Sequence, residues 1–103
     1  ERMLIKEAKL IEHAGAFSMV IECIAANAAK NITNSIKIPT IGIGSSKYCD
    51  GQILVTDDIL GLSGFYPKFV KKYTNLSNII KNVVIKYKKE VIKKKFPTKK
   101  NSY

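Results

Sequence analysis

The sequence predicts an α/β domain built on a parallel sheet, and two observations support this prediction. Residues 17–21, 38–44 and 52–55 form three apolar runs of strand length, and strands of parallel sheets are typically apolar on both faces. Segments with helical periodicity alternate with these runs, at residues 3–13 and 25–35. The link between the second and third runs, about eight residues, is short for a parallel crossover, which usually takes about a dozen. The residues therefore leave the topology open.

The N-terminal elements begin with a helix over residues 3–13. Its apolar residues fall on one face: Leu4, Ile5, Ala8 and Ile11. Gly15 suits the left-handed residue that ends a helix. The strand at residues 17–21 follows, and it finishes on a single carboxylate, Glu22.

The second helix is predicted over residues 25–35, with an alanine-rich packing face: Ala28, Ala29 and Ile32. The next strand, 38–44, has Pro39 near its start, where a missing N–H is tolerated. A loop that contains "GIGSSK" then leads to the third strand, 52–55.

The C-terminal part is predicted to be helical. A short helix or turn covers residues 67–74 and is begun by its proline. The last helix has the clearest pattern, because its apolar residues recur at three- and four-residue steps and form one stripe: Leu76, Ile79, Ile80, Val83, Val84, Tyr87 and Val91. Asn75 or Ser77 can cap its start, Pro97 is expected to end it, and residues 97–103 form a polar tail.

Positive charge is concentrated at the C-terminal end. The net charge is +10, and residues 67–103 contain twelve lysines and a single acid, Glu90. A basic segment suggests a nucleic-acid or membrane-surface partner. However, lysine outnumbers arginine seventeen to one, and proteins that read bases usually depend on arginine. A solvated lysine surface is favoured, with no nucleic-acid partner.

No membrane segment or disulfide is expected. No apolar run approaches the ~18 residues of a membrane span, and no signal peptide is evident, so a cytoplasmic location is predicted. Cys23 and Cys49 do not form a metal-binding CxxC pair. Free, buried thiols are expected, with Cys23 pointing away from Glu22 and into the packing.

Glu22 is the main candidate functional residue. Sites in parallel α/β proteins open at the carboxyl ends of the strands. Glu22 occupies this end of the first strand, Gly44 and Ser45 occupy it on the second, and Asp57 and Asp58 follow the third. All three ends are expected to face one mouth. Alternatively, Glu22 caps the following helix, and sequence leaves both readings open; for the two aspartates a cap or turn is favoured.

Two weaker signals have structural explanations. The "GIGSSK" loop completes neither GxGxxG nor a P-loop, so a tight turn is favoured over a phosphate site. His13 lies among Lys and Glu residues and is expected at the surface.

Three strands that are apolar on both faces cannot be covered by three helices. The chain is therefore expected to be part of something larger. It opens on Glu1 and not on Met, which is expected of a processed, trimmed or partial product.

Several blocks resemble the C-terminal portion of the ketopantoate hydroxymethyltransferase family. "EHAGAFSMVIEC" is followed by "IPTIGIGSS", "CDGQILVTDDILGL" and "PKFVKKY", and the resemblance covers nearly the whole chain. The order and spacing of the "GIG", "DGQILV" and D-x-LGL blocks make it specific.

The resemblance implies a (β/α)8 TIM barrel, of which residues 1–103 would be the last three strands with their helices. Such a barrel needs ~250 residues. The implied reaction transfers a hydroxymethyl group from 5,10-methylenetetrahydrofolate to the keto acid 3-methyl-2-oxobutanoate and gives 2-dehydropantoate, in pantothenate and coenzyme A biosynthesis. The resemblance further implies a homo-oligomeric full-length enzyme, and residues 1–103 alone are expected to be inactive.

The resemblance also implies a Mg²⁺ ion that binds the keto acid. Its ligands, two aspartates and a glutamate, are expected in the N-terminal part of the enzyme, so no residue here is expected to bind metal. Glu22 matches the glutamate that is the family's proposed base for the C3 proton.

This chain departs from the family pattern at a few loop positions. Ala25 stands where proline is common, Ser45 and Ser46 replace Ala-Gly, and Asp57 stands where histidine is frequent. These changes bear on loop geometry and not on the assignment.

Two rival functions remain. A basic nucleic-acid-binding module would account for the lysines, but Tyr87 and Phe96 are the only aromatics near them and look like packing residues. A non-catalytic interaction domain would account for the missing metal site.

Overall fold

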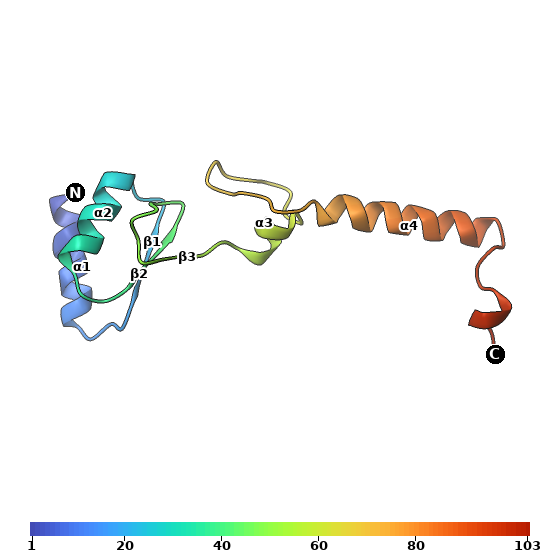
Figure 1. Cartoon of the computed structure of the whole chain (residues 1–103), viewed down its shortest axis with the longest axis horizontal. Coiled ribbons are helices and arrows are strands. Elements are labelled where there is room, and N and C mark those ends of the chain that lie inside the picture. Colours follow the sequence, from blue (N-terminus) through green and yellow to red (C-terminus); the bar gives the residue numbers. More distant parts are fainter. The chain divides into compact units, whose positions relative to one another are not determined.

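A computed structural model describes all 103 residues, which form two compact units (Figure 1). Unit 1 comprises Glu1–Val55 and Pro67–Val70, and unit 2 comprises Thr56–Tyr66 and Lys71–Tyr103. The predicted α/β class is confirmed, and the whole sheet belongs to unit 1.

The first helix, α1, spans Arg2–His13 and agrees with the prediction. Ala8 is buried, but Ile11, which was expected beside it, is 46% exposed. Ile11 borders a shallow hollow beside β1 (Met19–Glu22), and β1 is an edge strand with no neighbour on that side.

Gly15 ends α1 as predicted, with a φ of +94°. Its N–H bonds to the Glu12 carbonyl at 3.0 Å, and the Ala16 N–H bonds to the Ile11 carbonyl at 3.3 Å. This pair of bonds satisfies carbonyls that the helix end would otherwise leave free.

The sheet has three parallel strands in the order β1-β2-β3, where β2 spans Thr40–Ile43 and β3 spans Gly51–Gln52. The topology that the sequence left open is thus parallel despite the short link. The first strand begins at Met19 and not at Phe17, whose side chain is exposed.

The prediction of a third strand over residues 52–55 was too long. The Ile53 N–H still bonds to the Gly42 carbonyl at 3.0 Å, but the ladder stops there. The partner strand β2 ends at Ile43, and the chain turns away at Gly44 with a φ of +62°. Residues beyond Ile53 therefore have no strand to pair with.

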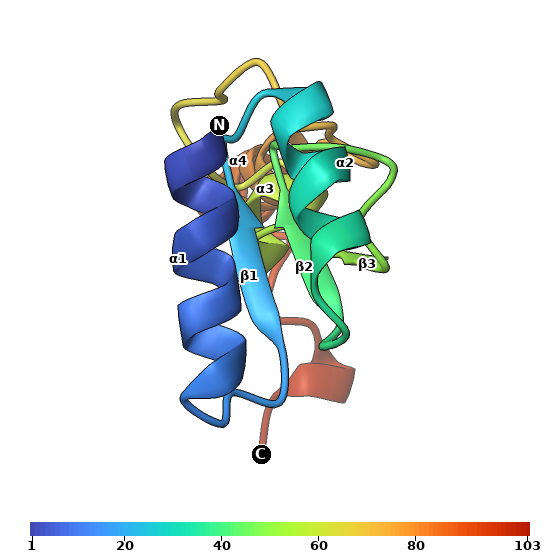
Figure 2. The same ribbon diagram turned by 90° about the vertical axis from the view of Figure 1, so that its left-hand side faces the viewer.

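The second helix, α2 (Ala26–Ser35), buries the predicted alanine-rich face. Helices α1 and α2 lie in front of β1 and β2 in Figure 2, on one face of the sheet. The buried cluster between these layers is Ala8, Ile21, Ala29, Ile32 and Cys49. The small alanine side chains let the helices approach the strands closely, which places the core on this side.

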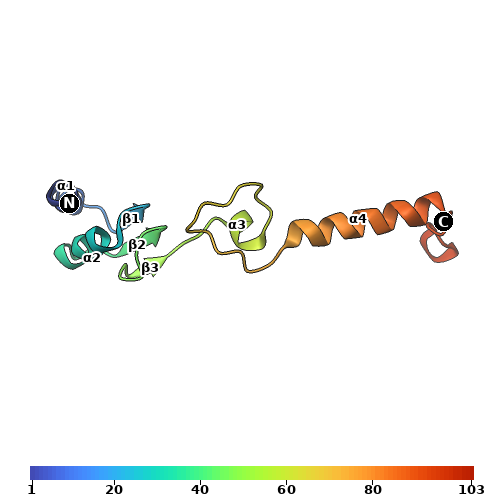
Figure 3. The same ribbon diagram turned by 90° about the horizontal axis from the view of Figure 1, so that it is seen from above.

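The other face of the sheet has no helix in unit 1, and Figure 3 shows the same layering from above. Side chains alternate between faces along a strand, and Val20 pairs with Ile41 in the register. Val20 is 58% exposed, and Ile53 and Val55 are also exposed. The expectation that three helices leave apolar strand surface uncovered holds in unit 1.

Unit 2 contains α3 (Thr56–Leu60), α4 (Leu76–Ile92) and a 3-10 turn, η1 (Lys99–Asn101). The sequence did not predict α3. The α4 prediction is confirmed, and the Asn75 side chain caps it by accepting the Asn78 N–H at 3.3 Å. No side chain of α4 is buried.

One C-terminal prediction needs correction. Pro97 does not end α4, because the helix stops at Ile92 and Lys94 already has a φ of +53°. The sequence predicted a short helix or turn at residues 67–74, begun by Pro67. The structure has the turn: the Val70 N–H bonds to the Pro67 carbonyl at 2.9 Å, within the part of the stretch that belongs to unit 1.

Candidate active site at the carboxyl edge of the sheet

The carboxyl ends of β1 and β2 meet at one edge of the sheet. Glu22, the last residue of β1, pairs with Ile43, the last residue of β2. Gly44 and Ser45 follow directly. The predicted juxtaposition of these strand ends is therefore confirmed for the first two strands.

Glu22 lies on the face of β1 that carries no helix. Burial alternates along the strand, with Ile21 buried toward the helices and Val20 and Glu22 exposed on the opposite face. The carboxylate thus stands at the carboxyl edge, above the uncovered apolar face and away from the packed core.

The alternative role for Glu22, capping the next helix, is wrong for this structure. The N-cap of α2 is Ala25, and no side-chain hydrogen bond caps the helix. Glu22 is therefore free to act on something other than its own backbone.

The loop after β2 forms a tight turn, which the sequence analysis favoured over a phosphate-binding loop. Gly44 is needed there on two counts: its φ is +62°, and a Cβ atom would lie 2.7 Å from the Phe69 ring. The Ser46 hydroxyl accepts the Tyr48 N–H at 3.2 Å, and the Cys49 N–H bonds to the Ser46 carbonyl at 3.3 Å.

Ser45 links this loop to the end of β1. Its hydroxyl donates to the Ile21 carbonyl at 2.7 Å and accepts the Ile24 N–H at 3.1 Å. These two residues flank Glu22 and Cys23. The sequence singled out Ser45 by its place at a strand end, but it contained no signal for this bridge.

A second network, which the sequence analysis missed, ties the start of β2 to the residue before β3. The Asp50 carboxylate accepts the Thr40 N–H at 2.8 Å and the Thr40 hydroxyl at 3.0 Å. The Thr40 hydroxyl also contacts that of Thr33 at 2.9 Å, and Thr40 is fully buried. The backbone and side-chain hydrogen bonds from Thr40 lower the pKa of Asp50. The only sequence feature that marked this place was the Asp50-Gly51 pair, a common turn sequence, directly before the apolar run of the third strand.

The two cysteines are free, as predicted, but only Cys49 is buried. Cys23 is exposed because it falls outside β1, with a φ of +53°, so strand alternation does not extend to it. His13 is exposed in the last turn of α1, as expected.

Asp57 and Asp58 belong to unit 2, where they occupy the first turn of α3. Negative side chains are favourable at this end of a helix. Asp58 also accepts a hydrogen bond from the Ser63 hydroxyl. Both observations agree with the cap or turn reading.

No group of three or more His, Cys, Asp or Glu side chains in residues 1–103 could hold a metal ion. None of the helices combines the length and the apolar character that a bilayer crossing requires.

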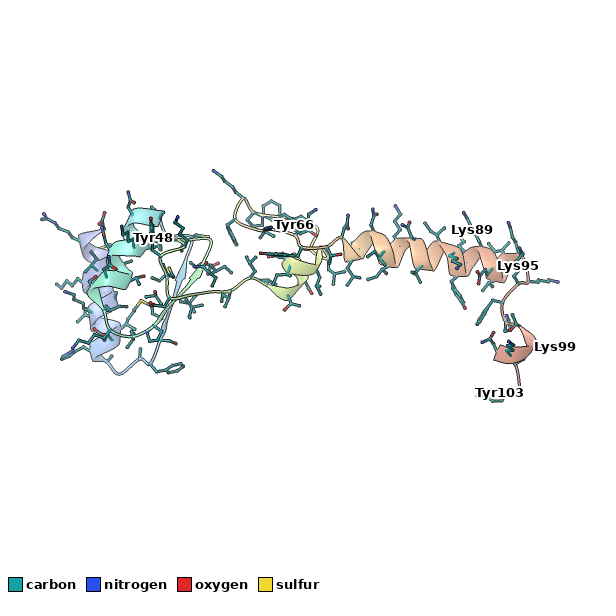
Figure 4. The ribbon with its side chains drawn as sticks, in the orientation of Figure 1. Tyr48, Tyr66, Lys89, Lys95, Lys99 and Tyr103 are labelled. Carbon is teal, nitrogen blue, oxygen red and sulfur yellow. The ribbon has the colours of Figure 1, made fainter.

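The lysines of unit 2 lie along its elements, and four of them border one open hollow at the end of α4: Lys86, Lys89, Lys93 and Lys95. Figure 4 shows Lys89 on α4, Lys95 beyond its end and Lys99 on η1. Tyr87 and Phe96 pack edge to face with ring centroids 5.6 Å apart, so the two aromatics near these lysines contact each other.

Comparison with known proteins identifies the family. A profile described as ketopantoate hydroxymethyltransferase matches residues 1–99. Proteins named 3-methyl-2-oxobutanoate hydroxymethyltransferase are similar to this chain: that of Pelagibacter ubique is 51% identical over 102 residues, and that of Sulfurisphaera tokodaii is 54% identical over 99 residues.

These alignments cover 99% and 96% of this chain but only 40% and 37% of the relatives. A Clostridium botulinum relative, 53% identical over 103 residues, is covered to 38%. The chain thus spans about two fifths of the length of the curated relatives it matches. By its match over nearly its whole length, the chain belongs to the ketopantoate hydroxymethyltransferase family.

Proposed function

We propose that the full-length protein containing residues 1–103 transfers a hydroxymethyl group from 5,10-methylenetetrahydrofolate to 3-methyl-2-oxobutanoate and forms 2-dehydropantoate. The observation that carries the proposal is the position of Glu22, whose carboxylate ends β1 on the helix-free face, within a chain of this family. In this role the protein serves pantothenate and coenzyme A synthesis in the cytoplasm.

The fold of the whole enzyme in this proposal is a (β/α)8 barrel, and residues 1–103 supply its last three strands. Three features support this. The strands are parallel, α1 and α2 cover one face of the sheet, and the opposite face exposes Val20. In a barrel, that face would be the interior. The relatives are long enough to supply the other strands, since this chain covers 38–40% of those from Clostridium botulinum and Pelagibacter ubique. We expect the whole enzyme to be a homo-oligomer and residues 1–103 alone to be inactive.

Glu22 acts as the general base. Its carboxylate takes the proton from C3 of 3-methyl-2-oxobutanoate, and the electrons of the C–H bond form the enolate. Water hydrolyses 5,10-methylenetetrahydrofolate: both bonds from its methylene carbon to nitrogen break, the two nitrogens take the protons of the water, tetrahydrofolate leaves, and the carbon and the water oxygen form formaldehyde. C3 of the enolate then bonds to the formaldehyde carbon, and the resulting alkoxide takes back the proton held by Glu22 to give the hydroxymethyl group. A base placed within hydrogen-bond reach of such a proton typically accelerates its transfer 10²–10⁴-fold.

The residues present do not fit a magnesium site, since none of their acidic, histidine or cysteine side chains cluster in a suitable group. The ligands of the Mg²⁺ ion are therefore assigned to the part of the enzyme outside residues 1–103. The role of Glu22 as a base does not depend on which residues bind that ion.

The nucleic-acid alternative is not favoured, because the matched family is one of small-molecule enzymes. A non-catalytic interaction role has no observation of its own to support it.

The test is Glu22→Gln in a complete enzyme. A suitable host is the Pelagibacter ubique relative, with this chain replacing its matching 102 residues. Gln keeps the size of the side chain and cannot take the proton. We expect kcat to fall roughly 10²–10⁴-fold while keto-acid binding persists, and Glu7→Gln, on the exposed surface of α1, to leave kcat unchanged.

Deuterium exchange at C3 of the keto acid in D2O, without folate, isolates the proton-transfer step. This exchange should be lost in Glu22→Gln and kept in Glu7→Gln. An exchange rate and kcat close to wild type in Glu22→Gln would remove Glu22 from the role of base.

A further inference from the structure

The turn that follows Glu22 breaks the alternation of the strand. In an extended strand, residues two apart point to the same face of the sheet, so Glu22 and Ile24 would share one face. Here Glu22 is exposed on the helix-free face, whereas Ile24 packs against the buried cluster between the helices and the sheet. The backbone therefore changes its conformation at the residue between them, Cys23.

Cys23 makes this change with a left-handed backbone. Its φ is +53°, and Lys94 is the only other residue besides glycine with a positive φ. A Cβ atom makes this conformation unfavourable by roughly 1–2 kcal/mol, and β-branched residues are rare outliers there. Such strain persists only where the surrounding structure imposes it, and it is concentrated at functional sites.

Three features on either side of Cys23 impose its conformation. The Cys23 N–H bonds to the Ile43 carbonyl at 2.9 Å, which continues the pairing of β1 with β2 beyond Glu22. Helix α2 begins at Ala26, so only three residues join it to β1. Ile24, in the middle of these three, is held by the core. An extended Cys23 would either draw Ile24 out of the core or turn the Glu22 carboxylate into it, where an unpaired charge is costly.

We propose that Cys23 is a positioning residue for Glu22: its left-handed backbone lets the carboxylate face the open side of the sheet while Ile24 stays anchored in the core. This inference rests on the proposed role of Glu22 as the base. Cys23 acts through its backbone conformation and its thiol takes no part, so it is not a catalytic residue.

The experiment uses the full-length chimera of this chain with the Pelagibacter ubique relative, and it ranks substitutions at Cys23 by how readily each new residue adopts a left-handed backbone. Cys23→Gly and Cys23→Asn favour this conformation. Cys23→Ala keeps the Cβ atom and removes the thiol. Cys23→Val strongly disfavours the conformation, and Cys23→Leu, which is not β-branched, disfavours it less and supplies the test if Cys23→Val does not fold.

Lys94→Val is the matched control, because it places the same β-branched side chain at the same φ of +53°, after α4 and not after Glu22. Each variant is measured for kcat, KM, C3 exchange and melting temperature. Cys23→Val is also combined with Glu22→Gln, which shows whether the two positions act as one unit.

We expect Cys23→Val to lower kcat and C3 exchange roughly ten- to a hundredfold with KM unchanged, because misplacement of a base costs rate and not binding. Cys23→Leu should cause a smaller loss of the same kind. The Gly, Asn and Ala variants should stay close to wild type, and Lys94→Val should leave C3 exchange unchanged. In the Glu22→Gln background, Cys23→Val should have no further effect, since residues that act as one unit are not additive.

The outcomes separate this inference from the proposed function. If Glu22→Gln leaves C3 exchange intact, the base role itself fails, and the positioning role fails with it. If Glu22→Gln abolishes exchange but Cys23→Val and Cys23→Leu keep the wild-type kcat, or lower it equally in both backgrounds, only the positioning role of Cys23 is overturned.

Two further results would also overturn the positioning role. A loss in Cys23→Gly, Cys23→Asn and Cys23→Ala as large as in Cys23→Val would show that the thiol matters and not the backbone. A loss of C3 exchange in Lys94→Val as large as in Cys23→Val would show a general effect of backbone strain.

Discussion

Unit 1 and helix α4 of unit 2 have similar apolar patterns in sequence but differ in what they bury. In unit 1, two helices cover one face of a sheet, and Ile21, Ala29 and Ile32 are almost fully buried. In α4, seventeen residues long, no side chain is buried, and Val83 at the middle of its apolar stripe is 61% exposed.

The difference shows that an apolar pattern in the sequence stabilises the fold only where another element covers it. Burial of apolar surface stabilises unit 1 at about 25 cal/mol per Å². Helix α4 gains little from its stripe within residues 1–103, where Tyr87 packs against Phe96 but no side chain is buried. Its stability here depends mostly on propensity and capping, which are weak in an isolated helix. Unit 1 should therefore be the more resistant of the two regions to opening.

The largest expected effect comes from breaking the core of unit 1. In the polypeptide of residues 1–103, Ile21→Ala removes a side chain packed between the sheet and the helices. Such deletions cost about 2–5 kcal/mol. Hydrogen exchange of the Cys23 and Ile53 amides, which both bond to β2, should become faster by a corresponding factor.

Val83→Ala is the matched control in α4. An exposed substitution of this kind usually changes stability by less than about 0.5 kcal/mol, so exchange in unit 1 should stay as in wild type. Wild-type amides of α4 should also exchange faster than those of Cys23 and Ile53. Equal protection in the two regions, or an equal response to the two substitutions, would contradict the comparison.

A smaller effect is expected from the Asp50 network, which exists only in unit 1. Hydrogen bonds from Thr40 lower the pKa of Asp50 in the folded state. A carboxyl group with a lowered folded pKa stabilises the protein above its unfolded pKa of about 3.9. This contribution is lost as the pH falls from there through the folded value.

Asp50→Asn in the full-length chimera of this chain with the Pelagibacter ubique relative should therefore lower the melting temperature at pH 7. The difference from wild type should shrink as the pH falls below about 4. Glu7→Gln, which changes an exposed carboxylate on α1, should leave the pH dependence as in wild type. A constant difference at every pH would mean that the Asp50 charge makes no contribution.

Sequence was sufficient where a local rule decides the structure. The helix ends at Gly15 because only a residue tolerant of positive φ fits there, and α2 packs through its alanines because they share one face. The sequence also predicted correctly that β1 ends at Glu22, because the apolar run stops at this charged residue.

Sequence failed where pairing partners decide. The third strand ends after Gln52 because β2 turns away at Gly44, which no property of residues 53–55 reveals. The hydrogen bonds from Ser45 to Ile21 and Ile24 join segments more than twenty residues apart. Nothing in the sequence around a loop serine shows which distant backbone groups its hydroxyl will bond. The exposure of the α4 stripe has the same origin, since periodicity predicts a face and not what covers it.

The smallest expected effect concerns the start of α4, where sequence offered Asn75 or Ser77 as the cap. The structure selects Asn75, whose side chain accepts the Asn78 N–H. Because no side chain of α4 is buried, the cap contributes a larger share of its stability than a cap would contribute to α2, which has no side-chain cap.

Asn75→Ala should cost about 1 kcal/mol of helix stability. The loss should appear as reduced helical circular dichroism in a peptide of residues 74–95, whereas Asn75→Asp should preserve the signal. Ser77→Ala should leave the signal nearly unchanged, and a loss as large as that of Asn75→Ala would show that the hydroxyl, and not the amide, begins the helix.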